Sequence, residues 1–117
     1  MKLRFRKNSL RLRVNQRETE MLAAGGELEE QVIFGGGATL SYRLAKTADG
    51  TKGTAQFDGR AIRVSAPLSG WANSDEIGFY FEVEPGLKVA IEKDLECLDG
   101  PAEEKDPHAF PRADKTC

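Results

Sequence analysis

The stretch KLRFRKNSLRLRV, residues 2–14, decides how the rest of the chain is interpreted. Apolar and basic side chains alternate along it, which is the period-two pattern of a half-buried strand. The apolar side chains occupy odd positions up to Phe5 and even positions from Leu10. Either a two-residue turn at Lys7-Asn8 folds the stretch into a hairpin, or a bulge within one long strand restores the phase. Both arrangements gather the apolar side chains on one face and the basic side chains on the other.

The hairpin arrangement makes the basic face a candidate anion-binding surface. The pairs it predicts are Leu3 with Leu12 and Phe5 with Leu10 on the apolar face, and Lys2 with Arg13 and Arg4 with Arg11 on the basic face. Like charges directly opposite each other destabilise a strand pair unless an anion lies nearby. Arginine also presents a planar fork that matches phosphate oxygens. The candidate anion-binding residues are Lys2, Arg4, Arg6, Arg11 and Arg13.

The chain also carries acidic residues that could neutralise this face internally. Residues 1–17 hold seven basic residues and no acidic one, whereas residues 74–117 hold twelve acidic and five basic residues. The acidic groups considered as partners are Glu27, Glu29 and Glu30, or Glu92, Asp94 and Glu96. Ion pairs across strands would satisfy the cations locally. A pI near 5.5 and the lack of aromatic residues interleaved with the cations argue against nucleic acid as the partner.

Local signals divide most of the remaining chain into short elements. Asn15 followed by Glu18 is a capping-box pattern, so we expect a helix at residues 16–24, with Met21 and Leu22 as its core contacts. Gly25-Gly26 would end that helix. Alternating apolar positions predict antiparallel strands at 28–34 and 40–44, and again at 79–83 and 87–91, where Val83 would lie opposite Leu87.

Two further segments complete the predicted core. Asp58-Gly59 is the strongest hairpin signal in the chain, and it predicts Ala55 opposite Ile62 and Phe57 opposite Arg60. We expect Ala55, Phe57, Ile62 and Val64 to face one side of that hairpin. Residues 67–72 read as a short helical turn that presents Trp71. Trp71 could line a ligand pocket, but we favour its closing one end of the core.

These elements predict an α+β, β-dominated fold. It would contain an antiparallel twisted sheet or partly open barrel of six to eight short strands with one clear helix. A length of 117 residues with 39% hydrophobic residues fits one domain. We assign residues 1–98 to this domain and residues 99–117 to an acidic, proline-containing tail. The first residues lack the apolar run of a secretory signal or membrane helix, so we expect a cytoplasmic protein with no membrane partner.

Cys97, His108 and Cys117 form the second candidate site. Thiolate and imidazole groups are good zinc ligands, and a tail carboxylate could complete the set. The spacing lacks the two-residue ligand pairs of zinc fingers. A Cys97–Cys117 disulfide is another arrangement, which a cytoplasmic location disfavours. In a third arrangement, Cys97 is a free cysteine that packs as a small apolar residue. We therefore expect no cofactor unless these residues bind zinc.

We predict no catalytic residue from this sequence. Glu92, Asp94 and Glu96 would share a strand face, where closely held carboxylates could split their pKa values as a catalytic dyad does. A simpler interpretation is that these three acids are the counter-charges of the basic N-terminal strands. His108 lies among prolines, away from any serine or aspartate partner in a predictable element, so a hydrolytic triad has no support.

Several segments together resemble a family of small, uncharacterised bacterial proteins. The resemblance rests on KLRFRKNSLRLR at the start, WANSDEIGF in the middle and IEKDLECL near the end, and it extends from Lys2 to about Phe110. Relatives often have glycine where this chain has Lys7, and a Pro-Asn-Pro stretch where it has Phe110-Pro111-Arg112. The resemblance implies a cytoplasmic bacterial domain and transfers no active site.

The sequence thus predicts a non-enzymatic binding or interaction module. Its basic N-terminal strand face would either pair with acidic strands of the same chain or bind an anionic ligand or protein partner. The alternative is a metal-binding protein that uses Cys97, His108 and Cys117.

Overall fold

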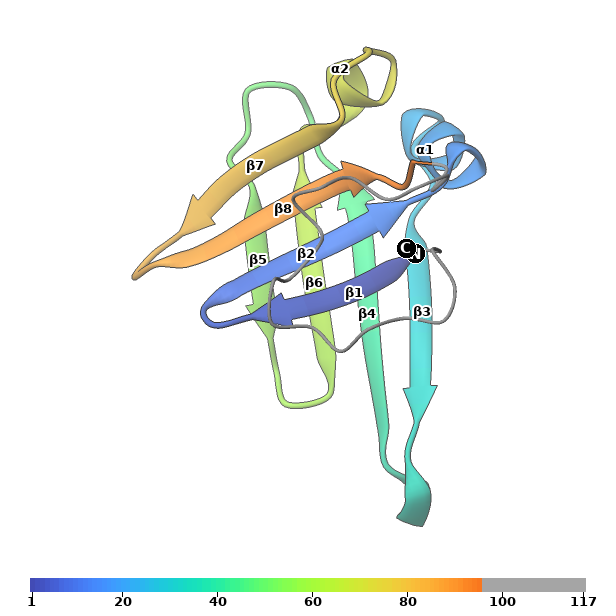
Figure 1. Ribbon diagram of the computed structural model, residues 1–117, viewed down its shortest axis with the longest axis vertical. Coiled ribbons are helices and arrows are strands. Elements are labelled where there is room, and N and C mark those ends of the chain that lie inside the picture. Colours follow the sequence, from blue (N-terminus) through green and yellow to red (C-terminus); the bar gives the residue numbers. More distant parts are fainter. Residues whose placement is uncertain (96–117) are drawn as a thin grey trace, which may run out of the picture.

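The structure is a computed structural model that describes residues 1–95. Within these residues, eight strands form two four-stranded sheets (Figure 1). The strands are β1 (Lys2–Arg6), β2 (Ser9–Val14), β3 (Leu28–Ile33), β4 (Thr39–Lys46), β5 (Thr54–Phe57), β6 (Ala61–Ala66), β7 (Gly78–Val83) and β8 (Leu87–Lys93). The helices are α1 (Gln16–Ala23) and α2 (Ser69–Ala72), with a 3-10 turn, η1 (Gly35–Gly37), between β3 and β4.

The first sheet has the strand order β1-β2-β8-β7 and begins with the predicted hairpin. Leu3 lies opposite Leu12 and Arg4 opposite Arg11, so the hairpin is confirmed in preference to a bulged single strand. Lys7 takes a φ of +51° in the turn, a left-handed conformation that is uncommon for residues other than glycine. β2 then pairs with β8 in parallel, and β8 pairs with β7 in the antiparallel register that places Val83 opposite Leu87.

The second sheet has the order β3-β4-β6-β5. β3 and β4 are antiparallel, as predicted, whereas β4 and β6 are parallel. The predicted register of the next hairpin was wrong, because Phe57 lies opposite Ile62 rather than Arg60, and Ala55 lies opposite Val64. The Asp58 carboxylate accepts hydrogen bonds from the backbone N–H groups of Arg60 and Ala61, both at 2.8 Å, and these bonds stabilise a loop longer than two residues.

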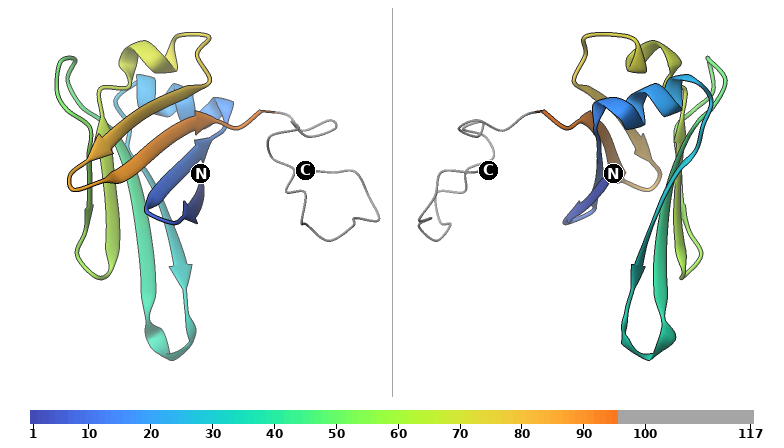
Figure 2. Two further views of the ribbon diagram at one scale, coloured as in Figure 1. Left: turned by 60° about the vertical axis from the view of Figure 1, so that its left-hand side comes forward. Right: turned by 90° about the vertical axis from the view of Figure 1, so that its right-hand side faces the viewer.

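The two sheets face each other as layers, with the helices across one end (Figure 2). The buried core lies between them and under the helices. Its members are Leu10, Leu12, Val14, Leu22, Leu28, Leu44, Ile62, Val64, Ala66, Leu68, Trp71, Val89 and Ile91. The fold class is therefore confirmed as α+β and β-dominated, although both sheets are mixed and they do not close into a barrel.

Helix α1 begins as the sequence predicted. The Asn15 side chain accepts a hydrogen bond from the Glu18 backbone N–H at 2.8 Å, and the Glu18 carboxylate accepts one from the Asn15 N–H at 2.9 Å. Leu22 is fully buried, but the expected core role of Met21 is wrong because 44% of that residue is exposed. Trp71 on α2 is 4% exposed and joins the core, in agreement with its predicted closing role. No described helix has the length and apolar character needed to cross a membrane.

Two phenylalanines expected in the core are largely exposed. Phe5 is 59% exposed and Phe57 is 64% exposed, although both follow the core alternation of their strands. Each lies within the last two residues of its strand, close to a turn. Alternation therefore identified the correct face of each strand, but it could not show where the opposing layer ends.

Candidate anion-binding face

The outer surface of the first sheet collects cations from three strands. We call it the basic face and define it by Lys2, Arg4, Arg6, Arg11, Arg13 and Lys88. Strand pairing orders its side chains in three rows across β1, β2, β8 and β7. The rows are Lys2, Arg13, Glu92 and Gly78; Arg4, Arg11, Ala90 and Tyr80; and Arg6, Ser9, Lys88 and Glu82. The five cations predicted as a group therefore share one surface.

Acidic residues at the end of the first sheet neutralise part of the basic face. Lys2 Nζ lies 2.7 Å from an Asp94 carboxylate oxygen. Glu92 Oε1 lies 3.1 Å from Arg11 Nε and 3.6 Å from Arg13 Nε, and the Glu92 side chain is 16% exposed. These carboxylates each face a cation rather than sharing a proton, so their arrangement differs from a catalytic dyad. Glu96, the third acid expected here, lies outside the described residues.

The acidic residues near β3 have other partners. Arg43 of β4 forms ion pairs with Glu29 and Glu27. Glu30 lies 3.4 Å from the Met1 ammonium nitrogen. All three carboxylates lie on or next to β3 of the second sheet. None of them forms an ion pair with the five candidate cations, which lie on the first sheet.

Arg4 and Arg6 differ from the rest of the face. Both are exposed on β1, and neither guanidinium group forms an ion pair or hydrogen bond with another described residue. Arg4 also lies directly opposite Arg11, a like-charge pair that costs stability in an antiparallel sheet. This part of the basic face therefore retains positive charge that an added anion could neutralise.

A shallow groove adjoins these arginines. It has a volume of about 580 Å³, and Ala90 of β8 lies between Arg11 and Tyr80 in its middle row. The small Ala90 side chain leaves space between its larger neighbours. Ser9, Lys88 and Glu82 continue the lining at one end. The groove thus combines two cations, a hydroxyl group, an aromatic ring and, at one end, the Glu82 carboxylate.

Tyr80 is the residue of this surface that sequence reasoning missed. It is 64% exposed, and its hydroxyl group donates a hydrogen bond to Glu92 Oε2 at 3.0 Å. Gly78 makes room for this arrangement, since a Cβ at position 78 would overlap the Tyr80 hydroxyl group. Partial burial, followed by the hydrogen bond and charge of Glu92, raises the pKa of Tyr80. In the sequence, the alternation of β7 places Tyr80 on the opposite side of the strand from Phe79 and Phe81, which indicates an outward-facing side chain. Only the pairing of β2 with β8 shows that this outer side belongs to the basic face.

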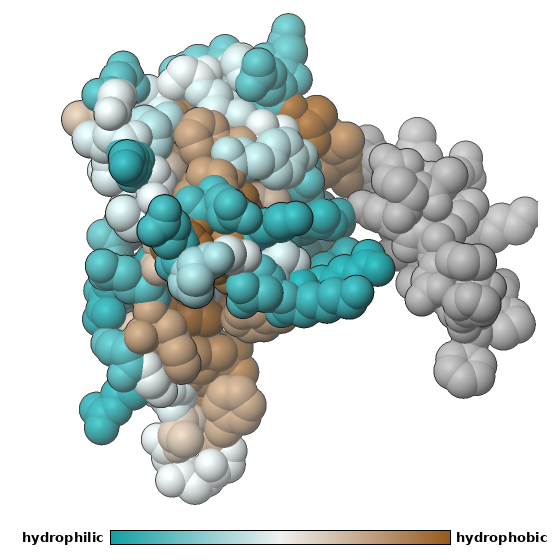
Figure 3. All heavy atoms as spheres, turned by 90° about the vertical axis from the view of Figure 1, so that its left-hand side faces the viewer, coloured by the Kyte–Doolittle hydropathy of each residue, from teal (hydrophilic) through white to brown (hydrophobic). Residues whose placement is uncertain are grey.

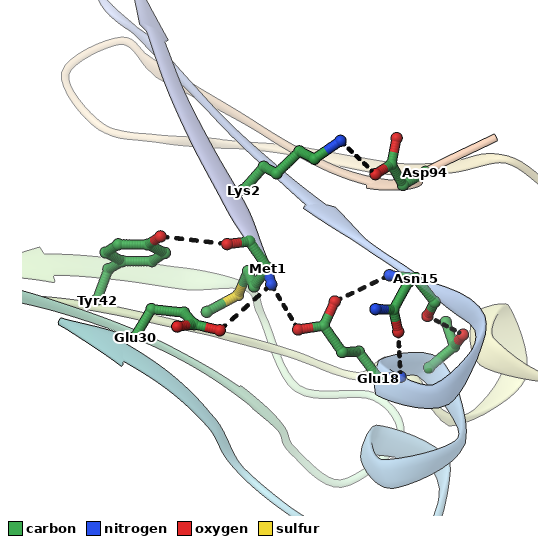
Figure 4. A network of polar contacts seen from close by, with 8 residues as sticks. Met1, Lys2, Asn15, Glu18, Glu30, Tyr42 and Asp94 are labelled. Atoms are coloured by element: carbon green, nitrogen blue, oxygen red, sulfur yellow. Dashed lines mark hydrogen bonds and ion pairs between the residues drawn. The ribbon is translucent and has the colours of Figure 1, made fainter. Parts of the chain in front are cut away.

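A polar network at the start of β1 connects this strand to helix α1 and to the second sheet (Figure 4). The Met1 ammonium group forms ion pairs with Glu18 and Glu30, and Tyr42 Oη donates a hydrogen bond to the Met1 carbonyl at 3.1 Å. Burial lowers the pKa of the ammonium group, but the hydrogen bond and charge of Glu18, with those of Glu30, outweigh it and raise that pKa. Burial, aided by Glu30 and Glu18, also raises the pKa of Tyr42. The network fixes the strand that carries Arg4 and Arg6.

The other predicted site residues do not join this surface. Trp71 is buried, and Lys93 Nζ lies 5.1 Å from the centroid of its ring while donating hydrogen bonds to the Trp71 and Ser74 carbonyls. Cys97, His108 and Cys117 lie outside the described residues. Residues 1–95 contain no cluster of three or more histidine, cysteine or acidic side chains able to hold a metal ion.

Comparison with known proteins places this chain in a family. Residues 1–114 match the model of a Family of unknown function (DUF7009), and the chain belongs to that family. The match covers nearly the whole chain and agrees with the expectation of an uncharacterised family. No curated protein and no solved structure gave a significant match.

Proposed function

We propose that this member of the family is a non-enzymatic binding module whose basic face receives an anionic ligand. The observation that carries this proposal is the state of Arg4 and Arg6, which are exposed and have no ion-pair partner among residues 1–95. Pairing within the chain accounts for Lys2, Arg11 and Arg13. It leaves the other two arginines available. We expect the protein to act in the cytoplasm.

The spacing of the two arginines indicates the form of the ligand. Arg4 and Arg6 are two residues apart on one strand, so their Cα atoms are about 7 Å apart. Each guanidinium group can form two parallel hydrogen bonds to a phosphate or carboxylate. A ligand with two or more phosphate groups, held about 7 Å apart, would engage both arginines at once.

The groove beside Arg11 supports the same proposal. A ligand bound to Arg4 could extend along the middle row toward Ala90 and Tyr80, which lie in register with it. Lys88 adds a further exposed cation in the adjacent row. Because the arginines are exposed, salt will screen their attraction for the ligand. We therefore expect binding that weakens as ionic strength rises.

Calorimetric titration with inorganic tripolyphosphate tests this function. The wild type should bind at about 50 mM salt and lose most of its affinity at about 200 mM. The double variant Arg4→Gln/Arg6→Gln should bind at least about tenfold more weakly, a loss of roughly 1.4 kcal/mol. Lys52→Gln/Arg60→Gln is the matched control, because it removes two exposed positive charges outside the basic face. Equal losses in both double variants, or no binding at low salt, would overturn the proposal.

A further inference from the structure

An apolar surface lies open at the end of the sandwich opposite the helices. The β3–β4 hairpin extends past the first sheet there, and its inner side has no layer over it (Figure 2). We call this surface the open apolar face and define it by Phe5, Val32, Phe34 and Phe57, with half-buried Leu40. Figure 3 shows it as a hydrophobic band that runs from between the sheets toward the hairpin tip. The exposed fractions are 59% for Phe5, 39% for Val32, 53% for Phe34 and 64% for Phe57.

Strand alternation assigns the members of this face on the β3–β4 hairpin to one side of the second sheet. Val32 pairs with Leu40, and both continue the alternation of Leu28 and Leu44, which are buried in the core. Phe34 follows in extended backbone with the same parity. Ile33 has the opposite parity and is 75% exposed on the outer side of the same hairpin. The open apolar face is therefore a continuation of the core beyond the edge of its cover.

The size of this face is comparable to that of the largest apolar patch on a typical monomer. An aromatic side chain offers about 200 Å², so the exposed parts of the three phenylalanines alone present roughly 350 Å². The largest apolar patch of a typical monomer is about 300–600 Å², and patches of that size are commonly interaction sites. Val32 and Leu40 add to the area, which places this face well beyond a single exposed side chain.

The absence of charged residues from the tip of the β3–β4 hairpin also favours an interaction site. Residues 31–41, QVIFGGGATLS, contain no charged residue, although charged residues make up 31% of the chain. β3 is also an edge strand, and proteins usually protect such edges with charged side chains. Glu30, which borders the face, forms an ion pair with the Met1 ammonium group. Two copies of this surface could therefore approach without bringing unpaired charges of the hairpin together.

We propose that the open apolar face binds the same face of a second copy of this chain. A two-fold dimer brings one patch against itself, so each copy supplies the missing layer for the other. Sheets pack face to face at about 10 Å, which lets the phenylalanines of the two copies interdigitate. A stable interface buries about 800 Å² per partner, and the apolar centre estimated above supplies nearly half of it, with the polar rim to be added.

Sedimentation and light scattering on the full chain test the dimer. The wild type should have twice the 12.9 kDa mass of one chain. Phe34→Asp should be monomeric at the same concentration because each dimer would bury two additional carboxylates in an apolar interface. Ile33→Asp is the matched control, since it adds the same charge one residue away on the opposite side and should leave the dimer intact. Thermal unfolding of each variant verifies its fold; Phe34 lies outside the strands and is half exposed, so the substitution leaves the core unchanged.

Three results would overturn the proposal. A wild type that stays monomeric at about 100 μM would show that the face does not hold two copies together. A Phe34→Asp variant as dimeric as the wild type would place the interface elsewhere. Equal dissociation in Ile33→Asp would show that the assigned side of the hairpin is wrong.

A photocrosslinking experiment locates the contact independently. Benzoylphenylalanine at position 34 should crosslink to peptides that contain Phe5 or Phe57 of the other copy. A mixture of isotope-labelled and unlabelled chains separates crosslinks between copies from those within one chain. Crosslinks between copies that map to the basic face, or crosslinks found only within one chain, would contradict the proposed dimer.

Discussion

Glu92 holds two arginines of the basic face, and replacing it should change stability and anion affinity in opposite directions. Its carboxylate contacts Arg11 Nε and Arg13 Nε at 3.1 and 3.6 Å and accepts the hydrogen bond of Tyr80 at 3.0 Å. An external anion must compete with this carboxylate for Arg11 and Arg13. Glu92→Gln removes the negative charge while keeping nearly the same side-chain shape, so it isolates the electrostatic contribution.

The contacts indicate the size of both effects. Exposed ion pairs contribute up to about 1 kcal/mol, and hydrogen bonds to charged groups contribute about 1.5–3 kcal/mol. Glu92 and Arg13 are 16% and 19% exposed, whereas Arg11 is 40% exposed, so solvent screening reduces only part of the sum. We expect Glu92→Gln to lower the free energy of unfolding by about 1–2 kcal/mol. Weaker competition for Arg11 should strengthen tripolyphosphate binding by up to about tenfold.

Urea unfolding and calorimetric titration measure the two effects on the same samples. Glu20→Gln is the control because it removes the same charge from an exposed position on α1, outside the basic face and its groove, where the described residues form no ion pair with it. It should leave stability within about 0.5 kcal/mol of the wild type. A Glu92→Gln variant that binds the anion no better than Glu20→Gln, or that is as stable as the wild type, would refute this competition.

Three further predictions concern the fold. Leu12→Ala should destabilise the protein by about 2–5 kcal/mol because Leu12 is fully buried, whereas Phe5→Ala should cost the isolated chain less than half as much in urea unfolding. Asn15→Ala should cost about 0.5–2 kcal/mol in the same assay through loss of the α1 cap. Glu18 raises the pKa of the Met1 ammonium group above its usual 8.0, so this stabilisation is complete below about pH 8 and disappears as the pH rises through the folded-state pKa. The difference in unfolding free energy between wild type and Glu18→Gln should therefore shrink from pH 7 to pH 10, and a constant difference would contradict the assigned cause.

The sequence predicted those parts of the fold that short-range signals encode. The observed β1–β2 register is one of the two arrangements that alternation left open, and the start of α1 followed from the Asn15–Glu18 capping box. The Asp58-Gly59 pair located its hairpin but misplaced the register, because the Asp58 carboxylate binds two backbone N–H groups and lengthens the loop. A side chain that hydrogen-bonds the backbone can thus override a preferred turn type.

Features that depend on distant strands could not be predicted in the same way. The parallel pairs β2–β8 and β4–β6 join strands that no turn connects, so no local signal marks them. Tyr80 reaches the basic face through the first of these pairs. The exposure of Phe5 depends on where the opposing sheet ends, which alternation within one strand does not reveal. The five candidate cations were found because one hairpin carries them all.

The ¹⁵N–¹H correlation spectrum of the protein, recorded during titration with tripolyphosphate at low salt, tests the anion-binding face most directly. We predict that the largest shifts will occur at Arg4, Arg6 and the groove residues Arg11, Tyr80 and Lys88, and that they will vanish in Arg4→Gln/Arg6→Gln. Shifts confined to the second sheet, or a spectrum that the anion leaves unchanged, would contradict the proposed function.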